Sequence, residues 1–360
     1  MNQSDEPIEA GIVNADISAA EETPRVAEDD LQLLEQASAG YSKLKDEIAK
    51  VIIGQEEIVR PALTAVFCQG HSLIIGVPGL AKTLLVKTLA DTLNWSFKRI
   101  QFTPDLMPSD IIGMELLQEN SDTGSREMRF VPGPIFGNII LADEINRTPP
   151  KTQSALLEAM QEYTVTSMGK THQLEKPFVV FATQNPIEQE GTYPLPEAQL
   201  DRFMFSLWVN YPTAEQEENI VFSTTDEREA AVEQVFTIDQ IRAFQSLVRR
   251  VPVSRHVVKY AVSLARATRP EEPDANVYVR NYVSWGAGPR AGQNLILAAK
   301  AMAVIDGQPT VTSSHVREAA PWVLRHRILP NYNAAGEGIS DSDIVKYILD
   351  NVPEPAYITS

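Results

Sequence analysis

The chain has 360 residues, of which 43% are hydrophobic and 22% charged, and its formal net charge is −17. This composition is typical of a globular protein with room for two domains, and no apolar run approaches the ~20 residues that a membrane-spanning helix needs. The acidic charge argues against a binder of duplex nucleic acid, which normally carries a strong basic excess on its binding face.

Two further features lead us to expect a cytoplasmic protein. The first ten residues, MNQSDEPIEA, lack the basic start and the apolar stretch of a secretory signal. The sequence has a single cysteine, Cys68, so an internal disulfide is impossible. Its apolar setting, AVFCQG, is typical of a small buried side chain.

Residues 1–38 are predicted to form a disordered acidic tail. Residues 1–40 hold ten acidic residues, one arginine and no aromatic residue. Such a segment buries too little apolar surface to offset the entropy of ordering the chain. Recruitment of a partner and simple solubilisation are both compatible with a tail of this kind.

Helices and strands alternate from residue 31 to about residue 211. The patterns of apolar residues predict helices over 31–48, 56–69, 83–93 and 152–162, and strands over 71–76, 97–102, 178–186 and 203–209, with a further strand inside 136–144. This alternation predicts an α/β fold with a mostly parallel sheet covered by helices on both faces.

Two β-hairpins interrupt this order and are expected to project from the domain as insertions. Met114–Val131 contains two short strand patterns around the turn sequence NSDTG. Tyr163–Leu174 has the same character, with its turn at Met168–Gly169.

The chain becomes helical from about residue 211. Thr213 with Gln216 and Thr237 with Gln240 form capping-box pairs. Further helices are predicted over 254–269, 291–305, 312–329 and 341–349, the first of them capped by Ser254. We therefore expect an acidic tail over 1–38, a nucleotide-binding α/β domain over 39–211 and a helical lid domain over 212–360.

The segment GVPGLAKT fits a phosphate-binding loop between a strand and a helix. The predicted nucleotide-binding residues are Gly76, Val77, Pro78, Gly79, Leu80, Ala81, Lys82, Thr83 and Leu84. Backbone N–H groups of such a loop and the positive end of the helix bind phosphate, the lysine reaches the β- and γ-phosphates, and the Thr83 hydroxyl is placed for Mg²⁺. Ala81 stands where the pattern has glycine, and an alanine is acceptable there if it has right-handed helical geometry.

Polar residues follow two of the predicted strands. Asp143 and Glu144 follow the apolar run IILA at the end of a predicted strand, where a carboxylate beside the phosphate loop binds Mg²⁺ and a second acid can polarise the attacking water. Asn185 ends the next strand, and neighbouring strand ends of a parallel sheet meet at one crevice. A side chain there can hold the water, although an asparagine before Pro186 is also a common turn residue.

Two arginines have the permanent charge and planar fork that stabilise a transferring phosphoryl group. Arg202 lies in LPEAQLDRF, before a strand, and Arg290 lies in GPRAGQ, at a predicted helix start. Taken alone, each is also compatible with an ordinary surface ion pair.

The chain resembles the AAA+ ATPases and, within them, the MoxR group. The resemblance rests on GVPGLAKT, IILADEINR, FATQNP, LPEAQLDRF and GPRAGQ in this order, together with the two hairpin insertions. It covers the chain from about Leu31 to the C-terminus.

The resemblance implies a ring-shaped homo-oligomer, expected to be hexameric, with ATP and Mg²⁺ between neighbouring subunits. It assigns Lys82 and Thr83 to Walker A, Asp143 and Glu144 to Walker B, Asn185 to sensor 1, Arg202 to the arginine finger, Arg290 to sensor 2 and Arg147 to a candidate position at the subunit boundary. It also implies a chaperone-like ATPase that remodels, assembles or matures protein complexes. The expected partner is a separate protein with a von Willebrand factor A domain or of the DUF58 type.

Three other functions share these motifs. One is a DNA-acting AAA+ motor, which the acidic charge disfavours. Another is a nucleotide-dependent scaffold with little turnover, which Glu144 and Arg202 disfavour. The third is a P-loop kinase, which the Asp-Glu pair and the two-domain division disfavour. The client protein and the action of Arg290 in cis or in trans stay open.

Overall fold

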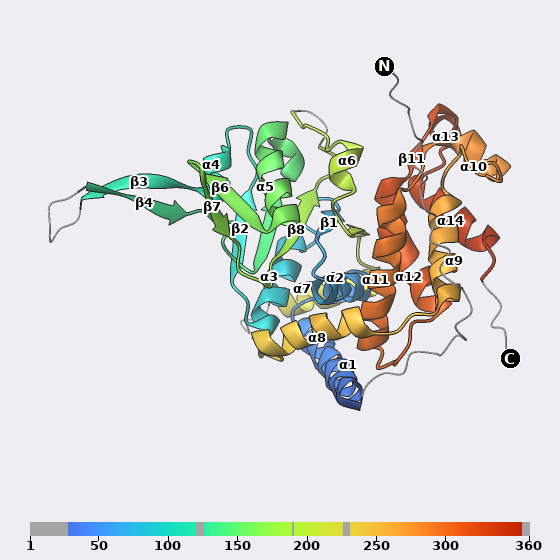
Figure 1. The fold of residues 1–360 in the computed structure, drawn as a ribbon, viewed down its shortest axis with the longest axis horizontal. Helices are drawn as coiled ribbons and strands as arrows, with labels where there is room; N and C mark the ends of the chain where they lie inside the picture. The colour runs from blue at the N-terminus through green and yellow to red at the C-terminus, as the bar shows by residue number, and fades with distance from the viewer. Residues whose placement is uncertain (1–27, 120–125, 189–190, 226–230, 355–360) are drawn as a thin grey trace, which may run out of the picture.

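The computed structural model describes residues 28–119, 126–188, 191–225 and 231–354. Five parallel strands form the central sheet in the order β2-β5-β8-β1-β9 (Figure 1). The strands are β1 (Ser72–Ile75), β2 (Phe97–Gln101), β5 (Ile139–Asp143), β8 (Val179–Gln184) and β9 (Phe205–Trp208). The predicted α/β fold with a parallel sheet is confirmed.

Helices cover both faces of the sheet. Ile139 and Leu141 of β5 point to a core shared with α2 (Glu56–Cys68), α3 (Lys82–Leu93) and the C-terminal helices, whereas Ile140 and Ala142 point to a core shared with α5 (Pro150–Glu162). All four side chains are fully buried. The two-residue period of a strand therefore places an apolar side chain on each face in turn.

Both predicted hairpins are present, and they pack on each other. β3 (Gly113–Glu119) pairs with β4 (Arg126–Pro132) after the short helix α4 (Pro108–Ile112), and β6 (Thr164–Ser167) pairs with β7 (Lys170–Gln173). The turn at 120–125 lies outside the described residues. The Phe130 ring stacks on His172 with 3.8 Å between centroids, and Lys170 Nζ lies 2.7 Å from Glu115 Oε1. Figure 1 shows the β3–β4 hairpin projecting on the side opposite the C-terminal helices.

The C-terminal part is mainly helical, as expected, although it also contains a short two-stranded sheet that was not predicted. Its elements are α7 (Ala214–Thr224), α8 (Ile238–Arg250), α9 (Arg255–Arg266), α10 (Val277–Tyr282), β10 (Val283–Trp285), α11 (Pro289–Ile305), α12 (Ser313–Leu324), η2 (Arg325–Arg327), β11 (Leu329–Pro330), α13 (Tyr332–Glu337) and α14 (Asp341–Asn351), after the short helix α6 (Glu197–Leu200). The capping boxes at Thr213 and Thr237 and the Ser254 cap are confirmed.

Two of these helices end earlier than predicted, for tertiary reasons. α9 stops at Arg266 because the hydroxyl of buried Thr268 donates to Ala265 O and accepts from the Ala287 N–H at 2.7 Å. α12 stops at Leu324, and the 3₁₀ turn η2 follows. Arg327 of this turn donates a hydrogen bond to Asp201, in the segment after α6.

The predicted disorder through residue 38 is wrong for residues 28–38. Helix α1 (Glu28–Ala49) starts at Glu28 and packs against α8 and α11, with Leu34 and Ala37 buried. Its first turn is acidic, which the positive end of the helix dipole favours, and Asp30 pairs with Arg250 at 2.7 Å. The helical spacing of the apolar residues, which predicts a helix over 31–48, is confirmed here, whereas the average composition of the segment was misleading. Residues 1–27 lie outside the described residues.

The absence of a side chain at Gly40 lets α1 pack closely against the Phe236 ring. A Cβ at this position would lie 2.0 Å from Phe236 Cζ. We expect Gly40→Ala to lower the free energy of unfolding by about 1–2 kcal/mol, because overpacking outweighs the gain in helix propensity.

Gly292 in α11 is the matched control, since a Cβ there would meet only Val262 Cγ2 at 3.9 Å. Gly292→Ala should raise the unfolding free energy by about 0.5–1 kcal/mol. Urea titration of both variants measures the difference, and a stabilising Gly40→Ala would contradict the packing argument.

Cys68 is a small buried side chain, as expected, and His71 is buried too. Burial raises the pKa of the Cys68 thiol. Burial also lowers the pKa of His71 to about 4, so this imidazole is neutral. Its Nδ1 accepts from the Val180 N–H and its Nε2 donates to Met160 O, both at 3.0 Å. His71 therefore ties the start of β1 to β8 and α5.

Candidate active site

The phosphate-binding loop runs from the end of β1 to the start of α3. Gly79 has φ +83°, and a Cβ there would meet nothing within 4 Å, so the backbone conformation and not space requires glycine. At Gly76 the reason is space, because a Cβ would lie 3.0 Å from Val209 O on the neighbouring chain segment. The loop leads into the N-terminus of a 12-residue helix. The free N–H groups at this helix end attract an anion.

Ala81 does not have the right-handed geometry under which an alanine is readily accepted in this loop. Ala81 has φ 54° and ψ 22°, which is the left-handed region, and it caps α3 by accepting the Leu85 N–H at 2.8 Å. This conformation costs an alanine about 1–2 kcal/mol, because its Cβ crowds the backbone carbonyl. The tight turn into α3 imposes the geometry that most phosphate loops assign to glycine.

Ala81→Gly should remove this strain. The gain is partly offset by the freer unfolded chain, so we expect the free energy of unfolding to stay level or rise by up to about 1 kcal/mol. Ala243→Gly, in the middle of α8, should instead lower it by about 1 kcal/mol. Urea titration compares the two, and an equal loss in both variants would contradict the strain at Ala81.

Lys82 lies folded against its own loop. Its Nζ donates to Gly76 O at 2.6 Å and to Val77 O at 2.7 Å. Partial burial lowers the pKa of Lys82, and the negative charges of Asp143 and Glu144 oppose that shift. The ammonium group is therefore positioned at the loop opening, facing two carboxylates.

Asp143 ends β5 and is held by its neighbours on both sides. The Thr183 hydroxyl of β8 donates to Asp143 Oδ1 at 2.6 Å, and the Arg99 guanidinium of β2 donates to Oδ2 at 2.7 and 3.0 Å. Since β5 lies between β2 and β8 in the sheet, both contacts follow from the strand order.

Glu144 follows directly and turns the chain out of the sheet. It has φ 57°, and its N–H donates to the Thr183 hydroxyl at 2.9 Å. Its Oε2 accepts from Gln101 Nε2 at 2.8 Å and lies 3.2 Å from Arg147 Nε. Glu144 is thus oriented by groups on two sides of the strand end.

Asn185 is nearly buried at the end of β8. Its Oδ1 accepts from the Ile187 N–H at 3.2 Å, which is the turn contact expected of an asparagine before proline. Arg147 forms an ion pair with Glu188 beside it, and this contact lowers the pKa of Glu188, with a smaller effect of the Asn185 side chain.

A cleft of about 460 Å³ brings these groups together. It is lined by Pro78, Gly79, Leu80, Ala81, Lys82, Thr83, Leu84, Arg99, Asp143, Glu144, Thr183, Gln184 and Asn185. Gly76 and Val77 contribute the carbonyls that hold Lys82.

Sequence reasoning missed Arg99 and Gln101. Both side chains lie on the same face of β2, and Gln101 is its last residue, so two polar side chains two positions apart at a strand end could have been noticed.

Arg202 and Arg290 lie in a different cleft, of about 260 Å³. Arg249 of α8 is a third arginine there, and no Asp or Glu is among the described residues that line it. Arg290 Nη1 donates to Asp201 Oδ2 at 2.8 Å. Within one chain, the structure therefore does not bring these two arginines to the phosphate loop, and Arg290 makes the ordinary ion pair.

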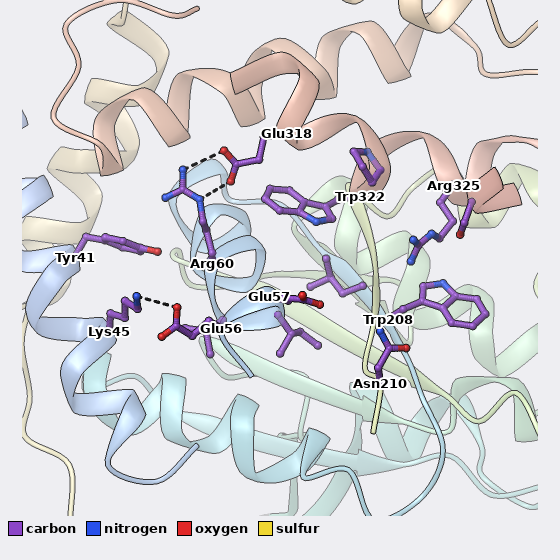
Figure 2. Close-up of a pocket in the computed structure, with 15 residues that line it drawn as sticks. Tyr41, Lys45, Glu56, Glu57, Arg60, Trp208, Asn210, Glu318, Trp322 and Arg325 are labelled. Atoms are coloured by element: carbon purple, nitrogen blue, oxygen red, sulfur yellow. Dashed lines mark hydrogen bonds and ion pairs between the residues drawn. The ribbon is translucent and has the colours of Figure 1, made fainter. Parts of the chain in front are cut away.

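A larger cleft, of about 760 Å³, is lined by residues of α1, α2, β9 and α12 (Figure 2). Arg60 of α2 crosses it, with Nη2 2.9 Å from Asp306 Oδ2 and Nε 2.6 Å from Glu318 Oε1. The Arg325 guanidinium lies over the Trp208 ring, 5.4 Å from its centroid. None of the predicted site residues lines this cleft, whose contacts join the two parts of the chain.

Comparison with known families finds matches in two separate parts of the chain. Residues 71–205 match the model of the ATPase family associated with various cellular activities (AAA), and residues 277–348 match an AAA lid domain. We call residues 277–348 the lid. In the part of the chain that the structure describes, no helix is both long enough and apolar enough to cross a membrane.

Several relatives match over most of the chain. Chaperone MoxR1 of Mycobacterium tuberculosis is 42% identical over 86% of this chain and 81% of its own length. YeaC of Bacillus subtilis, an uncharacterised protein, is 41% identical over 87% and 94%. A solved structure of a candidate ATPase from Cytophaga hutchinsonii has a TM-score of 0.82 and 40% identity, covering 92% of this chain and all of that one.

Protein MoxR of Methylorubrum extorquens is 28% identical over 87% of this chain and 95% of its own length. Two family models in the expected order, two relatives above 40% identity and a shared fold agree with the geometry of the phosphate-loop cleft. The chain belongs to the MoxR family of AAA+ ATPases.

Proposed function

We propose that this protein is a Mg²⁺-dependent, chaperone-like ATPase whose active site is completed by a neighbouring copy in a ring, expected to be hexameric. One observation carries the proposal: the phosphate loop and Asp143-Glu144 share one cleft, whereas Arg202 and Arg290 line another. Head-to-tail contacts, which close into rings, would bring the two clefts of neighbouring copies together. We also propose the domain boundary near residue 212.

The residues of the cleft fit ATP and Mg²⁺. Lys82 already donates to two loop carbonyls, so its ammonium group needs only to turn to reach phosphate oxygens. The Thr83 hydroxyl and the Asp143 carboxylate would hold Mg²⁺, which prefers oxygen ligands and keeps several waters. The ion offsets the phosphate charge, and Arg99, which pairs with Asp143, supplies a further positive charge at the same place.

Glu144 would polarise the attacking water, and Asn185 would hold that water in place. The contacts of Glu144 with Gln101 and Arg147 support this role, because they orient the carboxylate before substrate binds. The ring would supply Arg202 and Arg290 from the neighbour, where their guanidinium groups would neutralise the charge that develops on the transferring phosphoryl group.

The projecting hairpin supports the remodelling of a partner protein. Leu116, Leu117 and Met128 are 49%, 60% and 48% exposed on β3–β4. A two-stranded hairpin with exposed apolar side chains is typical of a surface that contacts another protein. We propose that this hairpin contacts the client, and that a separate protein with a von Willebrand factor A domain or of the DUF58 type acts as the adaptor.

ATP turnover per subunit, measured against protein concentration with and without Mg²⁺, tests the proposal. We expect no turnover after chelation of Mg²⁺, and a rate per subunit that rises with concentration and then saturates as rings form. A constant rate down to concentrations at which the protein is monomeric would mean that one chain holds a complete site.

A further inference from the structure

Residues of the lid form hydrogen bonds with the segment that carries Arg202. Asp201, Phe203 and Met204 flank this arginine between α6 and β9, and each of them accepts hydrogen bonds from lid residues. Met204 also donates its N–H to His71 O at 2.7 Å, so the segment is tied to β1 on its other side. The backbone on both sides of Arg202 is therefore held at several points.

Arg327 of η2 makes most of these contacts. Its Nε donates to Asp201 Oδ1 at 2.7 Å, and its Nη2 donates to Phe203 O at 2.8 Å and Asp201 O at 3.0 Å. Its Nη1 donates to Val323 O at 2.5 Å and to Met204 O at 3.3 Å. The side chain is 1% exposed. A lysine could not reproduce this pattern, because only the guanidinium fork directs several N–H groups at once.

His326 adds a bond from the same turn. Its Nε2 lies 3.0 Å from Phe203 O, and burial keeps its pKa well below the usual value, so the ring is neutral and Nε2 carries the proton that it donates. Two consecutive lid residues thus bind the carbonyl that follows Arg202.

Asp201 lies between two lid arginines. Its Oδ1 accepts a hydrogen bond from buried Arg327. Its Oδ2 accepts one from Arg290, which lines the same cleft as Arg202. The carboxylate next to Arg202 is therefore bonded to both. A displacement of the lid would displace the backbone of Arg202 with it, since these bonds would otherwise have to break inside the protein.

We infer that Arg327 and Asp201 are positioning residues, which couple the orientation of the lid to the placement of Arg202 toward the neighbour's nucleotide. The inference rests on the proposed trans role of Arg202. A shift of about 1 Å in a catalytic group can cost ~10²-fold in rate, so a lid that carries the arginine can control turnover without touching ATP.

A double-mutant cycle tests this inference through single-turnover hydrolysis of γ-labelled ATP by the full chain. Arg202→Ala should lower the rate by about 10³-fold or more, and Arg327→Lys by roughly 10- to 100-fold. The double variant should be no slower than Arg202→Ala alone, because Arg327 acts through that residue. Binding of a fluorescent ATP analogue should be unchanged in all three.

Arg60→Lys is the matched control. Arg60 also joins the sheet domain to the lid region through two carboxylates, yet it contacts neither Asp201 nor Arg202. Any loss it causes should multiply with that of Arg202→Ala. Asp201→Asn, which alters the other end of the contact, should repeat the non-additive result of Arg327→Lys.

The outcomes separate the two proposals. If Arg327→Lys and Asp201→Asn each multiply with Arg202→Ala, or if both abolish assembly or analogue binding, the contact is structural and the inference is wrong. If Arg202→Ala itself hydrolyses ATP at the wild-type rate, the proposed completion of the site by a neighbour fails first.

Discussion

Glu144→Gln is expected to bind ATP normally and to hydrolyse it at least about 10²-fold more slowly, up to ~10⁴-fold. Glutamine keeps the size of the side chain and can still bond to Gln101, which holds Glu144 Oε2 at 2.8 Å. It cannot accept a proton from the attacking water. The loss should therefore appear in kcat, with the dissociation constant of ATP close to that of the unaltered protein.

Glu162→Gln is the control for this substitution, because Glu162 is exposed at the end of α5, away from the cleft. Its turnover should match the unaltered protein. Steady-state hydrolysis and equilibrium binding of a fluorescent ATP analogue measure the two effects separately. Normal turnover in Glu144→Gln would remove the role proposed for this carboxylate.

Two inactive variants are expected to restore activity to each other when they are mixed. Lys82→Ala disables the phosphate loop but leaves Arg202 intact, whereas Arg202→Ala does the reverse. If the arginine acts in trans, an Arg202→Ala subunit regains turnover beside a Lys82→Ala neighbour. An equal mixture should reach up to about a quarter of the unaltered rate, since one boundary in four of a randomly mixed ring pairs the intact halves.

The separation of the two clefts within one chain is the reason for this expectation. Hydrolysis by the mixture, compared with the two variants alone, is the measurement, and labelled subunits show whether the rings exchange. Exchange without recovered turnover would contradict the trans site. Recovery would also show that the loss in Arg202→Ala is not a folding defect.

Local sequence was sufficient for most of the residues that line the phosphate-loop cleft, although it did not indicate Arg99. The strands could be predicted because buried parallel strands are short apolar runs, and the cleft because polar residues follow those runs directly. Asp143 ends β5, Glu144 follows it directly and Asn185 directly follows β8, and adjacent parallel strands end at the same edge of the sheet. Covalent proximity to a strand end was enough to place them.

Composition was misleading at the N-terminus for a related reason. The acidic average of residues 1–40 predicted disorder, yet Leu34 and Ala37 are spaced to bury one side of α1 against helices more than 190 residues away in the chain. A few apolar side chains are enough to order a helix when helices distant in the sequence, here α8 and α11, provide an apolar surface for it to pack against. An average over a window does not contain that surface.

The sequence by itself was enough to predict the candidate groups of the site: a phosphate loop, an acid pair and two arginines, each recognisable from its neighbours in the chain. Only the tertiary structure decided how they are divided, with Lys82 and Glu144 in one cleft and Arg202 and Arg290 in another. The left-handed Ala81 and the bonds of Arg327 to Asp201 also needed it. The physical reason is that these features depend on contacts between distant segments, whereas local motifs depend on spacing along the chain.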